Sequence, residues 1–140
     1  MVAADVISLP RNIGFARRLA ALEHRFEAVL ARSRPDVAVV ESLFHGVNAR
    51  SALQLAHSRG VLLAVLGRLG IPVEEYTPAT IKKTVTGSGR ADKDQVRRMV
   101  QALLAVRLEG SSTDMSDALA AAYCHLAHGG FKAAVLRSKA

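Results

Sequence analysis

A short apolar run between two helix-like segments most constrains the fold of this chain. Residues 37–40 read VAVV, which suits a buried strand, and the run ends in the carboxylate Glu41. Before it, residues 11–33 place apolar side chains at spacings of three and four, and this helix should end before Pro35. After it, residues 49–69 have a second helical pattern. The alternation predicts an α/β fold in one domain.

The remainder of the sequence continues the same alternation. Residues 73–77 predict a short second strand, and residues 81–90 form a basic segment that runs into a glycine-containing loop. We expect a helix to open at Asp92, because Gln95 three residues later completes a capping box. The final helix should cover residues 113–128 and stop at the glycine pair that follows.

Length and composition favour a single domain. The chain has 140 residues, half of them apolar, and we expect a domain over residues 1–130 followed by a basic tail over residues 131–140. No apolar run approaches the roughly 18 residues of a membrane span, and the N-terminus lacks the pattern of a signal peptide. The single cysteine, Cys124, cannot form an internal disulfide. These features predict a cytoplasmic protein without membrane association.

The charge indicates a polyanionic partner. Lysine and arginine outnumber aspartate and glutamate by 19 to 12, giving a formal net charge of +7. Such an excess is typical of proteins that bind phosphate backbones. The plainer interpretation is a basic, soluble surface with no particular partner.

Three acids could form a metal site. Asp114 and Asp117 lie three residues apart at the start of the final helix, so they share a face, although acids there also stabilise a helix N-terminus. Glu41 strengthens the case for a site, because ligands of α/β sheets bind at the carboxyl ends of strands. Hard oxygen donors suit Mg²⁺ or Mn²⁺, which activate water against phosphodiesters. Acids in a basic protein therefore predict a metal-dependent nuclease.

Other candidate sites are weaker. His125 and His128 lie one turn apart beside Cys124 and could form a zinc set. A helix rises about 1.5 Å per residue, so His125 is more than about 10 Å along the axis from Asp114 and cannot share its metal. Residues 87–89 lack the surroundings of a phosphate-binding loop.

Three stretches resemble the RuvC family of Holliday-junction resolvases, or crossover junction endodeoxyribonucleases, over residues 9–128. They are AVVESLFHGVNARSALQLAHSRGVLLA, TPATIKKTVTGSGRADKDQV and TDMSDALAAAYCH. The resemblance implies a ribonuclease-H-like mixed sheet flanked by helices, and a homodimer. It also implies magnesium-dependent, symmetric cutting of four-way DNA junctions in recombination and repair. The implied partners are the branch-migration proteins RuvA and RuvB.

The resemblance also implies roles for individual residues. Three acids correspond to the catalytic metal ligands of the family: Glu41, Asp114 and Asp117. The residues implied to contact DNA are Phe44, Asn48, Lys82 and Lys93. For Phe44 the alternative is a loop residue folded onto the core, and for the two lysines it is a solvated charge. The apolar segment at residues 61–66 falls where the family dimerises.

One family motif is missing from this sequence. The family begins with a strand ending in G-hydrophobic-D-P-G, which carries the first of four catalytic acids, and Asp5 aligns better with a later strand. We therefore expect a fold lacking the first two family strands, and weak or no cutting by this chain. An internal start within a longer resolvase is favoured over a truncated gene product or a non-cutting relative. The alternative functions are a non-catalytic, basic, junction-binding dimer and a structural or interaction module.

Overall fold

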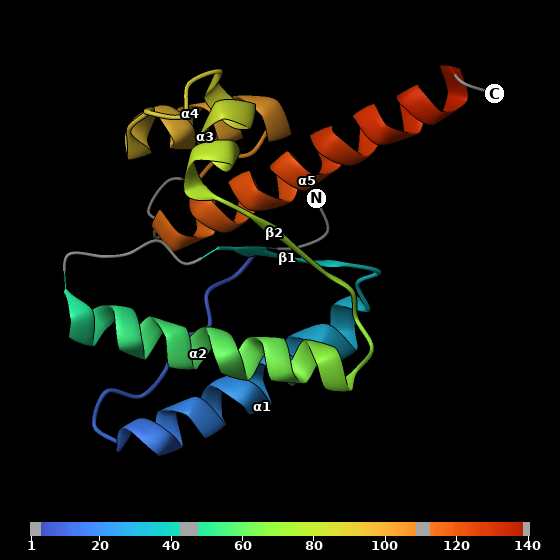
Figure 1. The fold of residues 1–140 in the computed structure, drawn as a ribbon. Helices are drawn as coiled ribbons and strands as arrows, with labels where there is room; N and C mark the ends of the chain where they lie inside the picture. The colour runs from blue at the N-terminus through green and yellow to red at the C-terminus, as the bar shows by residue number, and fades with distance from the viewer. Residues whose placement is uncertain (1–3, 43–47, 109–112, 139–140) are drawn as a thin grey trace.

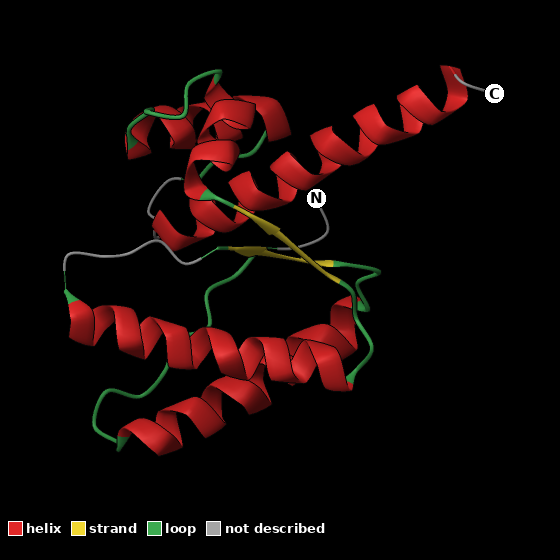
Figure 2. Cartoon of the chain, viewed as in Figure 1, coloured by secondary structure: helices red, strands yellow, loops and turns green. Residues whose placement is uncertain are grey.

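The chain folds into two helical layers with a small sheet between them. The computed structural model describes residues 4–42, 48–108 and 113–138, and side chains as far as residue 129. Helices α1 and α2 lie on one face of the sheet, and α3, α4 and α5 lie on the other (Figures 1 and 2). The elements are α1 Phe15–Ser33, β1 Ala38–Glu41, α2 Ala49–Arg68, β2 Val73–Tyr76, α3 Pro78–Thr86, α4 Lys93–Leu104 and α5 Thr113–Ser138.

The sheet of the described residues is a parallel pair of strands. Strand β1 pairs with β2 so that Ala38 lies opposite Val73 and Glu41 lies opposite Tyr76. Successive side chains of a strand point to opposite faces. Val39 packs against the core under α3, α4 and α5, so Glu41, two residues on, faces the same layer. Both predicted strands are confirmed, and this pair is the part of the predicted mixed sheet that the described residues contain.

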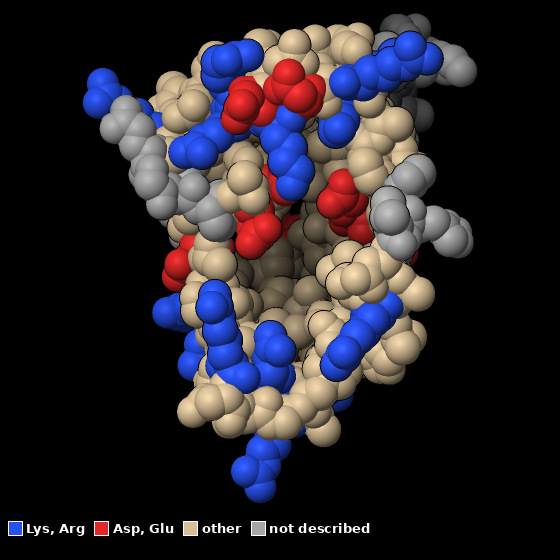
Figure 3. Space-filling model, turned by 90° about the vertical axis from the view of Figure 1, so that its left-hand side faces the viewer, with Lys and Arg blue, Asp and Glu red and all other residues tan. Residues whose placement is uncertain are grey.

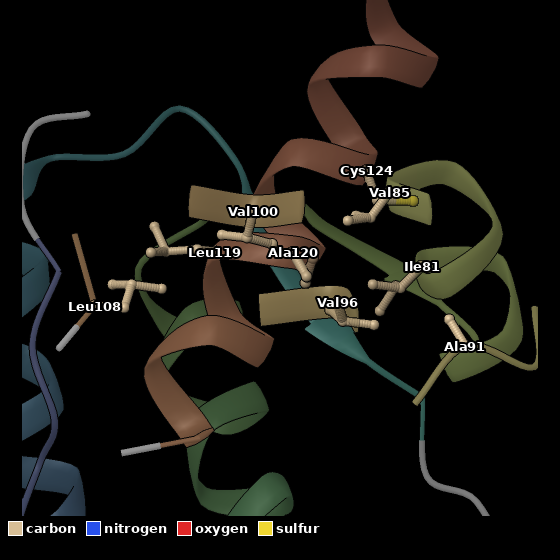
Figure 4. Packing of buried hydrophobic residues seen from close by; sticks show 10 residues of the cluster. Ile81, Val85, Ala91, Val96, Val100, Leu108, Leu119, Ala120 and Cys124 are labelled. Atoms are coloured by element: carbon tan, nitrogen blue, oxygen red, sulfur yellow. The ribbon is translucent and has the colours of Figure 1, made fainter. Parts of the chain in front are cut away.

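Each face of the sheet has its own hydrophobic core. On the α1–α2 face, Leu30, Val65 and Leu66 are buried, with Val40 packed against them. Part of the apolar segment at residues 61–66 is thus covered within the chain itself. The core on the other face joins α3, α4 and α5 (Figure 4), and its buried residues are Ile81, Val85, Ala91, Val96, Val100, Leu108, Leu119, Ala120, Ala121 and Cys124.

Local signals explain where most helices begin and end. Helix α1 ends at Ser33, and Arg34 follows in a left-handed conformation with φ of 43°. The predicted capping box is confirmed at α4: the Asp92 side chain accepts a hydrogen bond from the Gln95 backbone N–H, and the Gln95 side chain accepts one from the Asp92 backbone N–H.

Two helices differ from the prediction. Residues 78–86 form helix α3, where the sequence suggested only a basic segment, and its start is capped by Thr77 with Pro78 as the first helical residue. Helix α5 continues through Gly129 and ends at Ser138, so the predicted stop at the glycine pair is wrong. Two glycines in a helix interior lower its stability by about 2 kcal/mol relative to alanine. This cost is not enough to end α5. The division into a domain and a basic tail stays a prediction.

Within the described part of the chain, no helix is both long enough and apolar enough to cross a membrane.

Candidate active site at the carboxyl ends of the strands

Glu41 lies in a cleft because the strand that carries it ends there. The carboxylate closes β1 on the face covered by α5. Burial raises the pKa of Glu41 above its ordinary value, and the nearby charge of Asp117 raises that pKa further. Lys82 and Lys93 act in the opposite direction and lower the Glu41 pKa. Two acids and two lysines therefore interact at one end of the sheet.

Asp117 faces Glu41 from the first turns of α5. Its pKa is also raised, first by burial, and the nearby charge of Asp114 adds to the increase. Lys93 and Lys82 again lower the pKa. The two carboxylates thus lie in a partly desolvated place where their negative charges oppose each other. Such an arrangement favours a cation between them.

The cleft between the two acids is small and largely formed by helices α3, α4 and α5. It has a volume of about 260 Å³. Figure 3 shows a hollow in this face of the molecule, with acidic side chains along its upper part and lysine and arginine side chains above and below it. The residues lining the cleft are Glu41, Pro78, Ile81, Lys82, Lys93, Val96, Asp117 and Ala120.

The third predicted acid lies beside this pair. Asp114 is exposed in the first turn of α5 and reaches the cleft through its effect on Asp117. Among the described residues, no three acidic, histidine or cysteine side chains are grouped closely enough to hold a metal ion. The structure therefore brings Glu41 and Asp117 together, with Asp114 outside the lining. The assignment of all three as metal ligands stays a prediction.

The predicted DNA-contacting residues fall into three groups. Lys82 on α3 and Lys93 at the start of α4 both line the cleft. Asn48 caps α2, where its side-chain oxygen accepts hydrogen bonds from the backbone N–H groups of Arg50 and Ser51. Phe44 lies outside the described residues. Contact with DNA stays a prediction for all four.

The alternative sites weighed from the sequence lie elsewhere. Asp5 does not line the cleft of Glu41 but a different hollow, together with Phe26 and Val29 of α1. Cys124 is buried in the core, with its sulfur 3.5 Å from the Thr84 hydroxyl. A zinc set at Cys124 and its neighbouring histidines is not found within the part of the chain that the structure describes.

Sequence reasoning missed one polar contact near the cleft. The Tyr76 hydroxyl at the end of β2 forms a hydrogen bond of 3.1 Å with Nδ1 of His125 on α5. The two residues are 49 positions apart. The only sequence signal was a tyrosine as the last residue of a short strand.

Comparisons with known proteins agree with this geometry. The family model described as "Crossover junction endodeoxyribonuclease RuvC" matches residues 1–125. RuvC of Halorhodospira halophila is 44% identical over 128 residues, which are 91% of this chain and 76% of the relative. RuvC of Sorangium cellulosum is 42% identical over 139 residues, which are 99% of this chain and 77% of the relative.

The solved structures that resemble this chain are also RuvC proteins. The Thermus thermophilus RuvC structure matches with a TM-score of 0.82 and 26% identity, covering 94% of this chain and 79% of that one. T. thermophilus RuvC in complex with a Holliday junction substrate matches with a TM-score of 0.81 and 27% identity, covering 89% and 76%. The described elements define an α/β protein with an acidic cleft at the ends of parallel strands. The chain belongs to the RuvC family, and the ribonuclease-H-like fold prediction is confirmed.

Proposed function

We propose that this chain is a structure-specific endodeoxyribonuclease that cuts four-way DNA junctions in homologous recombination and repair, with a divalent metal ion as cofactor. The observation that carries the proposal is the pair Glu41 and Asp117, which face each other in a cleft lined by Lys82 and Lys93. Family membership supports the reaction class. The T. thermophilus relative was solved with a Holliday junction substrate, which supports the choice of DNA structure.

The donor chemistry of the cleft fits Mg²⁺ or Mn²⁺. Both ions prefer carboxylate oxygens. The raised pKa values of Glu41 and Asp117 support this fit, because burial disfavours their charged forms and a bound cation would favour them. We propose that these two residues hold the ion and that Asp114 completes the set from the rim. When bound, the ion supplies an activated water and neutralises charge on the phosphodiester.

The lysines have a separate task in this proposal. Lys82 and Lys93 come from different helices and reach the cleft from α3 and α4. A lysine ammonium binds a phosphate as a point charge, without fixing its orientation. We propose that the two lysines hold the phosphates that flank the scissile bond, while the acids hold the metal ion. Phe44 would contact bases near the crossover, and Asn48 would contact the backbone next to it.

A second copy of the chain is part of the proposal. A four-way junction has two strands to cut symmetrically, so two cleft-bearing chains would be needed. Helix α2 exposes Leu53 and Leu55, at 60% and 58% of their possible surface. We propose a homodimer that uses α2, working with RuvA and RuvB-type branch-migration partners.

A junction-cutting assay tests the proposed function. The 140-residue chain is mixed with a synthetic four-way junction or a linear duplex of the same sequence, in Mg²⁺ or Mn²⁺. We expect selective binding of the junction, and slow paired nicks that disappear in Glu41→Gln. Nicking that is equally fast on the linear duplex, or unchanged in Glu41→Gln, would contradict the proposal.

A non-catalytic junction-binding protein is the second candidate function. It is favoured by the net charge of +7 together with the position of Asp114 outside the cleft lining. Junction binding that survives Glu41→Gln, with no metal-dependent cutting by the unmodified chain, would support this candidate over the nuclease.

A further inference from the structure

A polar contact joins α5 to β2 next to the acidic cleft. The Tyr76 hydroxyl and His125 Nδ1 are 3.1 Å apart. The Tyr76 ring also lies against two histidine rings, with centroids 6.1 Å from His125 and 5.3 Å from His128. His128 is held there by a hydrogen bond of 2.8 Å from its Nδ1 to the Cys124 carbonyl. The contact spans the sheet–helix interface without lining the acidic cleft.

Tyr76 has a fixed relation to Glu41. The two residues are opposite each other in the register of the parallel strands. The Ser42 backbone N–H donates a hydrogen bond of 2.9 Å to the Tyr76 carbonyl, which fastens the chain directly after Glu41. Register partners project from the same face of a sheet, so both side chains point toward α5. A displacement of Tyr76 along the sheet would therefore also displace Glu41.

His125 has an equally fixed relation to Asp117. Both lie on α5, eight residues apart, which is about 12 Å along a helix. A helix of this kind moves as a unit, so its contact with Tyr76 also determines how far along the sheet Asp117 lies. The hydrogen bond between Tyr76 and His125 thus connects the supports of the two facing carboxylates.

Most core contacts of α5 resist a slide along its axis only weakly. Apart from Leu119, the buried side chains of the described part of this helix are small: Ser116, Ala120, Ala121 and Cys124. Small side chains form shallow ridges, and shallow ridges interlock weakly with a neighbouring helix. A hydrogen bond is directional and loses strength within a few tenths of an ångström of misplacement.

We infer that Tyr76 and His125 are positioning residues that set the axial register of α5 on the sheet, and thereby the separation of Glu41 and Asp117. This inference rests on the proposed role of those acids as metal ligands. Mg²⁺ requires ligands near 2.0–2.1 Å in octahedral geometry, whereas a slip of one residue along a helix is about 1.5 Å. A misplacement of about 1 Å in a catalytic group can cost about 100-fold in rate.

Metal binding by four variants of the 140-residue chain tests the inference. Mn²⁺ affinity is measured by electron paramagnetic resonance or calorimetry for Tyr76→Phe, His125→Ala, His125→Asn and Tyr123→Phe. We expect Tyr76→Phe and His125→Ala to weaken Mn²⁺ binding about three- to ten-fold, the equivalent of one hydrogen bond. His125→Asn keeps an acceptor near the position of Nδ1, so its affinity should stay within about two-fold of the original.

Tyr123→Phe is the matched control. It removes a tyrosine hydroxyl from α5, the helix that carries His125. Among the described residues that hydroxyl makes no hydrogen bond, and the ring packs beside the core. Its Mn²⁺ affinity should equal that of the unmodified chain. In cutting assays, Tyr76→Phe should lower kcat while KM for the junction stays unchanged, because the substitution leaves the DNA-contacting lysines in place.

Each outcome has one meaning. If Tyr76→Phe melts at a lower temperature but binds Mn²⁺ as tightly as the unmodified chain, the contact is only structural and the inference is overturned. If His125→Asn behaves like His125→Ala, the hydrogen bond is not what positions α5. If the unmodified chain binds Mn²⁺ no better than Glu41→Gln does, the proposed metal role of the cleft is wrong, and the inference fails with it.

Discussion

The two faces of the small sheet differ in the side chains that cover them. On the α1–α2 face, Leu30, Val65 and Leu66 form a core of larger aliphatic groups. On the other face, a larger core combines aliphatic residues with alanines and Cys124, and the ionisable pair Glu41 and Asp117 lies at its edge. The difference teaches that one face contributes packing alone, whereas the other combines a larger core with the acidic cleft, although the two share a sheet of only two described strands.

The largest expected effect is on the α1–α2 face. Leu66 is 1% exposed, so Leu66→Ala should lower the free energy of unfolding by about 2–5 kcal/mol. Urea denaturation measures the loss, and the Mn²⁺ affinity of the folded fraction should remain unchanged. The control is Leu126→Ala on α5, where the side chain is 67% exposed and the expected change is within about 0.5 kcal/mol. A fall in Mn²⁺ affinity parallel to stability would show that the faces are not independent.

A smaller and opposite effect is expected for Glu41→Gln on the chemical face. The folded-state pKa of Glu41 is raised above 4.5, so the folded chain binds this proton more tightly than the unfolded chain does. In metal-free buffer, stability should therefore fall as the pH rises from 4.5 through the folded-state pKa toward neutrality. Glu41→Gln should weaken this pH dependence and raise stability at neutral pH, since it removes a partly buried charge and its repulsion with Asp117.

Thermal melts of both chains across that pH range check the sign of the effect. Added Mn²⁺ should stabilise the unmodified chain at neutral pH and leave Glu41→Gln nearly unaffected. If Glu41→Gln destabilised the metal-free chain, the proposed difference between the two faces would be wrong, because the Glu41 carboxylate would then stabilise the fold.

The smallest expected effect is at the ion pair between α2 and β2. The Arg59 guanidinium nitrogen Nη2 lies 2.6 Å from the Glu75 carboxylate oxygen Oε2, and the two side chains are 18% and 47% exposed. A double-mutant cycle with Arg59→Ala and Glu75→Ala should give a coupling of about 0.2–1 kcal/mol in the free energy of unfolding. The coupling should shrink in high salt. A coupling well above that range, or an effect on Mn²⁺ affinity, would mean that this ion pair also supports the cleft.

The sequence predicted the features that depend on local rules. The strand ending in Glu41 and the capping box at Asp92 follow from neighbouring residues, and both are confirmed. The meeting of Glu41 with Asp117 followed from the rule that ligands gather at the carboxyl ends of strands. Helix α3 was missed although Thr77 and Pro78 form a standard helix start, because its lysines and the glycines that follow suggested a loop.

Features that depend on tertiary packing could not be predicted in the same way. The position of Asp114 outside the cleft lining depends on how α5 is rotated against the sheet. The contact between Tyr76 and His125 joins residues 49 positions apart and leaves no periodic pattern in the sequence. The local cost of glycine at Gly129 predicts an end for α5 there, whereas the helix continues to Ser138.

The alternation of β1 between its two faces also limits which insertions and deletions the chain can tolerate. Only residues 34–37 separate the end of α1 from the start of β1. One residue gained or lost in this turn that shifted the register would direct Val40 into the cleft and Glu41 into the aliphatic core. A shift of two residues would return each side chain to its original face, but Glu41 would no longer pair with Tyr76 in the strand register. Length changes in this turn should therefore be selected against more strictly than most substitutions within it.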